Sequence, residues 1–121
     1  MSDVQAVSHL LLQVQDLERA LAFYQGVLGF IERHRGTLAD GRLYVNHVQN
    51  LGLTTYPPGA EAGRSFDHLA FRCPDGIAAV VARLEAAGVA HDPPGRTPYG
   101  LSVYFRDPDG NRIECHDSTG I

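Results

Sequence analysis

The sequence contains no lysine, so all ten of its basic residues are arginines. This absence excludes a Schiff base on a lysine amine and phosphate binding by a P-loop lysine. The net charge of −4 carries no long run of one sign, which argues against binding to nucleic acid or anionic membrane. Only two cysteines are present, Cys73 and Cys115. They are too few for a disulfide framework and fit a reducing cytosol.

Long hydrophobic runs are also missing. No apolar stretch approaches the roughly 20 residues of a membrane span, and no signal peptide precedes the first expected strand. The chain has 121 residues and is 44% hydrophobic, which is enough for one domain with its own core. We therefore expect a single soluble, cytoplasmic domain that covers residues 1–121.

The strongest signal that is present is an internal repeat. The stretch 65–73, SFDHLAFRC, is a second copy of 7–14, VSHLLLQV, and His68 follows His9 by 59 positions. The same offset relates Leu10 to Leu69, Asp16 to Asp75 and Gly29 to Gly88. A chain that repeats itself once should fold as two similar modules, here about 7–57 and 65–117. We expect the two histidines to meet where the modules face each other.

The first module is expected to run from one strand through a helix to three further strands. Alternating side chains predict a strand over 8–14, and Asp16 then caps a helix that ends at Gly29. Strands follow at 30–35, 42–48 and 51–56. Prolines and glycines in 57–63 predict the linker between the modules.

The second module repeats this plan. We expect a strand over 66–73, a helix capped by Asp75 and closed by Gly88, and a short strand over 89–92. A loop opens at 93–95, and two strands, 101–106 and 111–116, form a hairpin around Asp107–Gly110. The order βαβββ, read twice, predicts an α+β fold in which two tandem modules form a curved mixed sheet around a metal-binding cleft.

Strand alternation predicts which side chains share that cleft. The apolar row of each strand should face the helices, which leaves His9, His68 and Glu114 on the concave side. Two imidazoles and one carboxylate can bind a divalent cation and leave positions open for water or substrate. We expect one ion, Fe²⁺, Mn²⁺, Ni²⁺, Co²⁺ or Zn²⁺. The alternative is that these side chains merely line a wet groove.

Further polar residues are expected on the same side. His116 and Tyr104 are candidate acid–base groups, and each could instead be a rim or packing residue. Ser102, Arg72, His47 and Tyr99 are candidate substrate contacts; Tyr99, between a proline and a glycine, could act as a lid.

These residues carry a resemblance to a known family. The segments SHLLLQVQDLERALAFYQGVLGF, DHLAFRC and VYFRDPDGNRIE resemble the vicinal oxygen chelate superfamily, which includes glyoxalase I, extradiol dioxygenases, fosfomycin-resistance enzymes and bleomycin-binding proteins. The resemblance covers both modules. It implies paired βαβββ modules, a homodimer, and metal ligands at His9, His68 and Glu114.

Departures from the family pattern indicate which branches of the superfamily the chain resembles less. Many members have a fourth ligand, and the repeat offset takes Glu114 to Thr55, a poor ligand. Fosfomycin thiol transferases carry a threonine two residues after the first ligand, where this chain has Leu11. Ser102 and Tyr104 do match substrate-contacting positions of those enzymes. Bleomycin-binding members generally lack the metal triad.

The sequence thus favours a metal-dependent enzyme that acts on a small molecule with two neighbouring oxygens. Dioxygenase-like ring cleavage, glyoxalase-like isomerase or lyase chemistry, and epoxide opening all fit, and the three-ligand pattern favours the first. The rival hypothesis is a metal-free protein that binds a drug or metabolite, as in bleomycin resistance, in the same cleft.

Overall fold

A computed structural model describes residues 3–60, 63 and 66–118. Residues 61 and 62 of the expected linker, and Ser65 at the expected start of the second module, lie outside the described residues. Within the described part of the chain, no helix is long and apolar enough to cross a membrane.

The first module forms one four-stranded sheet with a helix against it. Its elements are β1 (Leu10–Val14), α1 (Leu17–Leu21), the π-helix η1 (Ala22–Val27), β2 (Glu32–Thr37), β3 (Leu43–His47) and β4 (Leu51–Thr55). The strand order is β1-β4-β3-β2, with β1 parallel to β4 and the other pairs antiparallel. Asp16 caps the helix by accepting from Arg19 N at 3.1 Å, and Gly29 ends it with a positive φ of 76°, as the sequence predicts.

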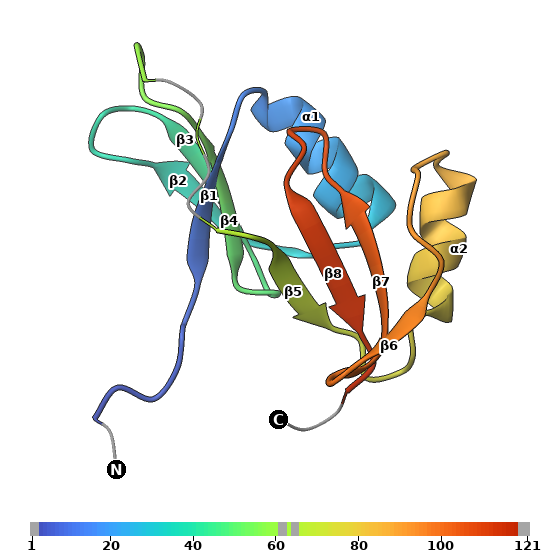
Figure 1. Ribbon diagram of the computed structural model, residues 1–121. Helices are drawn as coiled ribbons and strands as arrows, with labels where there is room; N and C mark the ends of the chain where they lie inside the picture. The colour runs from blue at the N-terminus through green and yellow to red at the C-terminus, as the bar shows by residue number, and fades with distance from the viewer. Residues whose placement is uncertain (1–2, 61–62, 64–65, 119–121) are drawn as a thin grey trace.

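The second module has the same topology. Its elements are β5 (Leu69–Arg72), α2 (Ala78–Ala86), β6 (Gly95–Thr97), β7 (Gly100–Arg106) and β8 (Arg112–His116). The strand order is β5-β8-β7-β6, again with the first pair parallel. The α+β prediction of two βαβββ modules is confirmed; the strands form two four-stranded mixed sheets, which lie side by side with the helices on one side (Figure 1).

Two local expectations in the second module are wrong. Asp75 does not cap α2: Gly76, with φ 101°, donates to Cys73 O and makes a turn after Asp75, so the N-cap position falls on Ile77 and the helix begins at Ala78. Residues 89–92 form no strand and contribute only one bridge, from His91 to Phe105. The edge strand β6 instead begins at Gly95. Prolines 93 and 94 lack the N–H groups that a continuous ladder needs, so the pairing is interrupted between these two segments.

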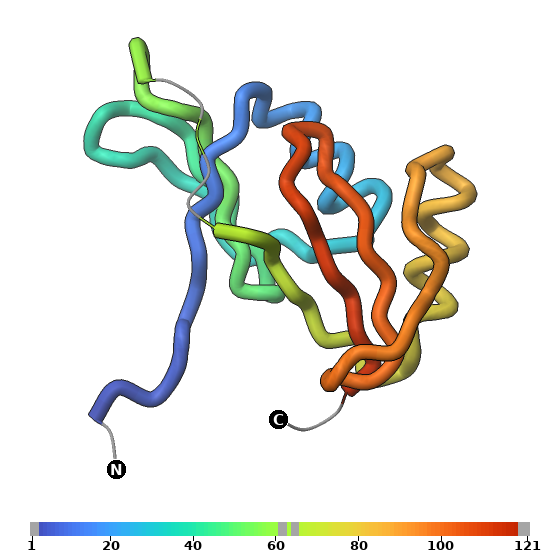
Figure 2. The backbone as a smooth tube through the Cα atoms, viewed as in Figure 1, coloured from blue at the N-terminus to red at the C-terminus, as the bar shows by residue number. Residues whose placement is uncertain are grey.

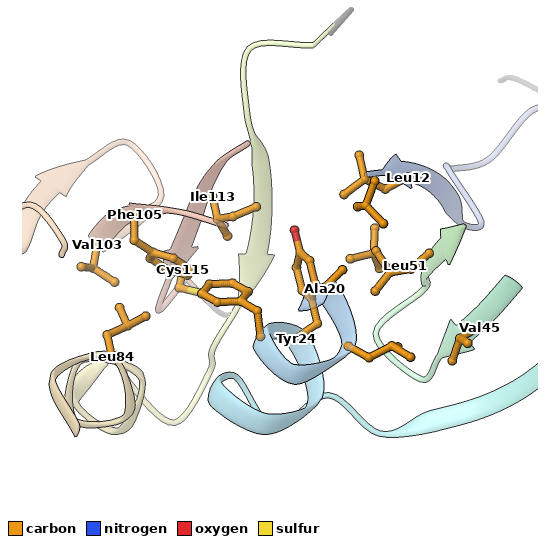
Figure 3. Packing of buried hydrophobic residues seen from close by; sticks show 14 of the residues in the cluster. Leu12, Ala20, Tyr24, Val45, Leu51, Leu84, Val103, Phe105, Ile113 and Cys115 are labelled. Atoms are coloured by element: carbon orange, nitrogen blue, oxygen red, sulfur yellow. The ribbon is translucent and has the colours of Figure 1, made fainter. Parts of the chain in front are cut away.

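The core joins the two modules. Tyr24 on η1 is fully buried and donates to Asp107 Oδ2 at 2.6 Å, which fastens the first helix to the hairpin of the second module. Phe30 and Phe71 meet edge to face with ring centroids 5.1 Å apart, again across the modules. Figure 3 shows Tyr24 between residues of both sheets. The segment before β1 extends away from this body, with Val7 85% exposed (Figure 2).

Candidate functional site

The open face of the second sheet carries the polar residues that the sequence placed there. Ile113 and Cys115 of β8 belong to the buried core, so the alternate residues Glu114 and His116 lie on the opposite face. Glu114 pairs in register with Tyr104, and His116 with Ser102. Strand alternation thus predicts this face correctly.

A histidine–carboxylate pair is the centre of this face. His68 comes immediately before β5, and its Nε2 lies 3.1 Å from Oε1 of Glu114. The Glu114 side chain is only 2% exposed, whereas that of His68 is 32% exposed. A carboxylate buried to this extent needs polar or charged partners, because an unpaired buried charge is strongly destabilising.

Two neighbours orient the pair. Ser102 donates to Glu114 Oε2 at 2.8 Å, and Asp67 Oδ2 lies 2.6 Å from His68 Nδ1. The hydrogen bond from His68 holds the pKa of Asp67 below its usual range, with a smaller contribution from Arg112. A carboxylate on the far nitrogen of a histidine is the common arrangement behind a metal ligand, since it fixes the ring and its tautomer.

The donor set fits a divalent cation. A neutral imidazole has one N–H group. When His68 Nδ1–H donates its hydrogen bond to Asp67, Nε2 carries no proton and directs a lone pair at the oxygen of Glu114. The 3.1 Å contact then requires a second proton or a shared metal ion between the two atoms. Two ligand atoms about 2.1 Å from one ion and at right angles lie about 3 Å apart. A cation is therefore compatible with the pair as it stands.

Tyr104 completes the polar cluster. Its ring lies edge-on to His68, with centroids 6.0 Å apart, and Arg112 lies 4.2 Å above the ring centroid. Partial burial and the hydrogen bond to Glu114 raise the pKa of Tyr104 above its ordinary range. The hydroxyl therefore stays protonated at neutral pH and can donate a hydrogen bond.

His9 does not join this cluster within one chain. It precedes β1 and lines a pocket of about 310 Å³ on the first sheet, together with Arg33, Asn46 and Gly52. Among the described residues, no three histidine, cysteine, aspartate or glutamate side chains are grouped so that they could hold a metal ion. The chain thus separates the expected ligands into one residue on the first sheet and two on the second.

The first sheet has no counterpart of Glu114. In the parallel pairs, Leu11 faces Gly52 as Ala70 faces Glu114, so the equivalent position is Gly52. The expectation that Thr55 is equivalent is wrong, because the offset of 59 at the first strands becomes 62 at the last. A Cβ at Gly52 would collide with Asn46 Oδ1. The side chain of Asn46 fills the space where a fourth ligand would lie.

His47 points away from the open face. It shares a face of β3 with Val45, is 1% exposed, and its Nδ1 lies 2.8 Å from Leu51 O. Its Nε2 lies 3.0 Å from Gln25 on η1. The prediction that His47 faces the cleft is wrong. On β3 His47 alternates with Leu43 and Val45, which puts its ring on the helix side, where Leu51 O and Gln25 contact its two nitrogens.

A chain of hydrogen bonds runs from Glu114 to the turn that holds Tyr99. Ser102 Oγ lies 3.0 Å from Thr97 Oγ1, which accepts from Tyr99 N at 3.1 Å. The Tyr99 ring lies over His116, with centroids 5.4 Å apart. Arg72 is exposed on β5 and pairs in register with His116. These predicted residues therefore continue the same face beyond Glu114.

A family comparison agrees with this architecture. Residues 6–115 match the model of the Glyoxalase/Bleomycin resistance protein/Dioxygenase superfamily. The chain belongs to this superfamily. The match spans both modules, so the resemblance inferred from three short segments is confirmed over nearly the whole chain.

Several individual proteins of known structure or activity are similar to this chain. The chain is 32% identical over 124 residues to the metallothiol transferase FosB of Shouchella clausii, covering 96% of this chain and 82% of that protein. TnmS3, an antibiotic binding protein from Streptomyces sp. CB03234, is 31% identical with a TM-score of 0.70, over 96% and 98% of the two chains. A superfamily domain from Frankia sp. EAN1pec aligns at a TM-score of 0.77 with 26% identity, over 94% and 98%.

The sequence reasoning missed three residues of the site. Asp67 orients His68, Thr97 links Ser102 to the Tyr99 turn, and Arg112 covers the Tyr104 ring. Asp67 could have been found, because a carboxylate directly before an expected histidine ligand is in reach of its Nδ1. Thr97 could not, since the edge strand that contains it was expected to be a loop.

Proposed function

We propose that this protein is a divalent-metal-dependent enzyme acting on a small molecule that chelates the metal through two neighbouring oxygens. The observation that carries the proposal is the contact between His68 and the buried Glu114, with Asp67 orienting the histidine and Ser102 the carboxylate. Metal-binding side chains usually have such hydrogen-bond partners behind them. Two side chains that merely line a wet groove would not need these partners. The similarity to a metallothiol transferase supports the same reading.

The third ligand, His9, would come from a second copy of the chain. Each chain carries His9 on one sheet and the His68–Glu114 pair on the other, so neither sheet holds a complete set. A twofold dimer that places the first sheet of one copy against the second sheet of the other would complete two identical sites. We therefore propose a homodimer, for which light scattering at micromolar protein should give twice the 13.2 kDa of one chain.

The residues around the pair suit an oxygen-chelating substrate. A divalent cation held there would stabilise the negative charge that develops on the substrate oxygens. Tyr104 lies beside Glu114 with its proton retained, so its hydroxyl would donate to one of those oxygens. A pocket of about 400 Å³ lies on the other side of Tyr104 from this pair; it is lined also by His91, Arg106 and Arg112 and includes neither His68 nor Glu114.

Two reaction classes fit this arrangement within the superfamily. Three protein ligands leave several coordination positions open, which favours dioxygenase-like ring cleavage with Fe²⁺. Glyoxalase-like isomerase or lyase chemistry is the second class. Leu11 occupies the position where the fosfomycin transferases carry a threonine, so we do not extend the FosB activity to this chain.

Metal analysis of protein purified without chelators tests the proposal. We expect about one divalent ion per chain in the wild type, and strong loss in both His68→Ala and Glu114→Gln. Glu85→Gln is the matched control, because it makes the same substitution at a glutamate on α2 whose side chain is 66% exposed. Unchanged occupancy in both site variants would contradict the proposal. Oxygen uptake with catechols under Fe²⁺ and hemithioacetal turnover under Ni²⁺ then separate the two classes.

A binding protein without enzymatic activity is the second candidate. It is favoured by the 31% identity to the antibiotic binding protein TnmS3 over nearly the whole of both chains. Exposed Leu10 and Leu11 on β1 offer apolar contact for such a ligand. Tight binding of a hydrophobic drug by protein that takes up no metal would decide for this function.

A further inference from the structure

The open face of the second sheet continues beyond the proposed metal ligands. His116 follows Glu114 by two residues on β8, and Arg72 is its register partner on the parallel neighbour β5. Register partners on parallel strands point to the same face, with backbones about 4.8 Å apart. Two residues of strand span about 7 Å, so this pair lies about 7 Å along the face from Glu114.

His116 is buried with an unused polar atom. It is 6% exposed, and its Nδ1 has no hydrogen-bond partner in the described part of the chain. Nearly all buried polar side-chain atoms in native proteins have a partner, because desolvation without one is unfavourable. The exception here lies on the substrate side of the sheet, where a ligand can supply the missing partner.

Arg72 supplies a positive charge beside this nitrogen. It is exposed, and none of the ion pairs formed among the described residues includes it. Two other arginines share this face: Arg112 contacts Asp67 at 3.4 Å and the Tyr104 ring, and Arg106 donates to Gly110 O at 2.9 Å. Arg72 is therefore available to a negatively charged group that approaches His116.

The Tyr99 side chain covers His116. Its ring lies 5.4 Å from that of His116 at an interplanar angle of 32°, and the residue is 43% exposed. The backbone of the turn is anchored through Thr97, so access requires rotation of the Tyr99 side chain and no movement of the strands. Rotation of an exposed side chain is fast, on the picosecond to nanosecond scale.

We propose that Arg72 and His116 form a subsite for an anionic group of the substrate, a carboxylate or another oxyanion, covered by Tyr99 when no substrate is bound. The guanidinium gives a charge-assisted hydrogen bond, and His116 Nδ1–H donates the second. The inference rests on the proposed function, since it places the anion about 7 Å from the chelating oxygens. It narrows the substrate class to small oxygen chelators with a negatively charged arm.

Two chelators that differ only in such an arm provide the test. 3,4-Dihydroxybenzoate carries a carboxylate opposite its catechol oxygens, and catechol does not. Calorimetry on the Zn²⁺-loaded protein should show that 3,4-dihydroxybenzoate binds about ten- to a hundredfold more tightly than catechol. Arg72→Gln should abolish this preference and leave catechol binding within twofold. Arg96→Gln is the matched control, because Arg96 is exposed on β6 opposite Leu101, on the other face. Equal affinities in the wild type, or a preference that survives Arg72→Gln, would overturn the subsite.

A second measurement separates this inference from the proposed function. In metal-free protein labelled with ¹⁵N-histidine, 3,4-dihydroxybenzoate should shift the Nδ1 resonance of His116, and catechol at equal concentration should not. A shift upholds the subsite even when Zn²⁺ fails to bind His68 and Glu114, an outcome that would remove only the metal-dependent function. Absence of the shift at saturating 3,4-dihydroxybenzoate contradicts the subsite whatever the metal does.

Discussion

Replacing Ser102 with alanine should weaken metal binding without removing a ligand. Ser102 Oγ donates to Glu114 Oε2 at 2.8 Å, and both residues are nearly fully buried, at 1% and 2% exposed. A hydrogen bond to a charged group contributes about 1.5–3 kcal/mol, and each 1.4 kcal/mol is about tenfold in affinity. With a metal in place, His68 Nε2 becomes a ligand, so Ser102 and Tyr104, both on β7, are the strand partners that orient the carboxylate. We expect metal affinity to fall about ten- to a hundredfold.

Competition against a colorimetric zinc chelator measures this change. Thr55→Val is the matched control, because it removes a strand hydroxyl at the end of β4 in the other sheet. Thermal unfolding of each metal-free variant confirms that the fold is retained before affinities are compared. A Ser102→Ala affinity within twofold of the wild type would refute the reasoning that Ser102 orients a metal-binding carboxylate.

Three further predictions concern the fold and the chemistry. Tyr24→Phe removes the 2.6 Å hydrogen bond to Asp107 and should lower the free energy of unfolding in urea by about 1.5–3 kcal/mol; no change would mean that this link between the modules is not stabilising. The hydrogen bond from Arg35, with a smaller one from Gln25, lowers the pKa of Glu32 from its ordinary 4.5 to about 2, so the resulting stabilisation is complete above pH 4.5 and lost as the pH falls towards 2; a carboxyl ¹³C titration midpoint near 4.5 would contradict this. Tyr104→Phe should lower turnover on any chelating substrate by about 10²–10⁴-fold with metal content intact, as should His116→Ala if it also moves a proton; full turnover would exclude the acid–base role.

Much of the fold was predictable because the repeat and the local signals agree. His9 and His68 mark the two first strands, and Asp16 and Gly29 mark the ends of the first helix as the structure has them. Alternation on β8 also places Glu114 and His116 on one face. Both faces of β8 are buried, so its faces are told apart by chemistry: apolar Ile113 and Cys115 alternate with polar Glu114 and His116.

Each of the errors has its own physical origin. A fixed offset of 59 predicted Thr55 as the counterpart of Glu114. The second module has three more residues between its first and last strands, so the counterpart is Gly52. His47 alternates with Leu43 and Val45, so strand alternation already places it on the helix side, where Gln25 and Leu51 O contact its nitrogens. The sequence also could not predict that His9 and Glu114 remain apart within one chain, because strand faces do not determine how the two sheets are placed relative to each other.

Complementation between two inactive variants tests the cross-chain metal site most directly. His9→Ala and Glu114→Gln should each bind almost no metal alone. After unfolding, mixing in equal amounts and refolding, about half of the dimers contain one copy of each variant. In these dimers, one of the two sites regains His9 from one chain and the His68–Glu114 pair from the other. The account predicts recovery of about a quarter of the wild-type metal content. Recovery of none in the mixture, with full binding by the wild type refolded in parallel, would contradict a site shared between two copies of the chain.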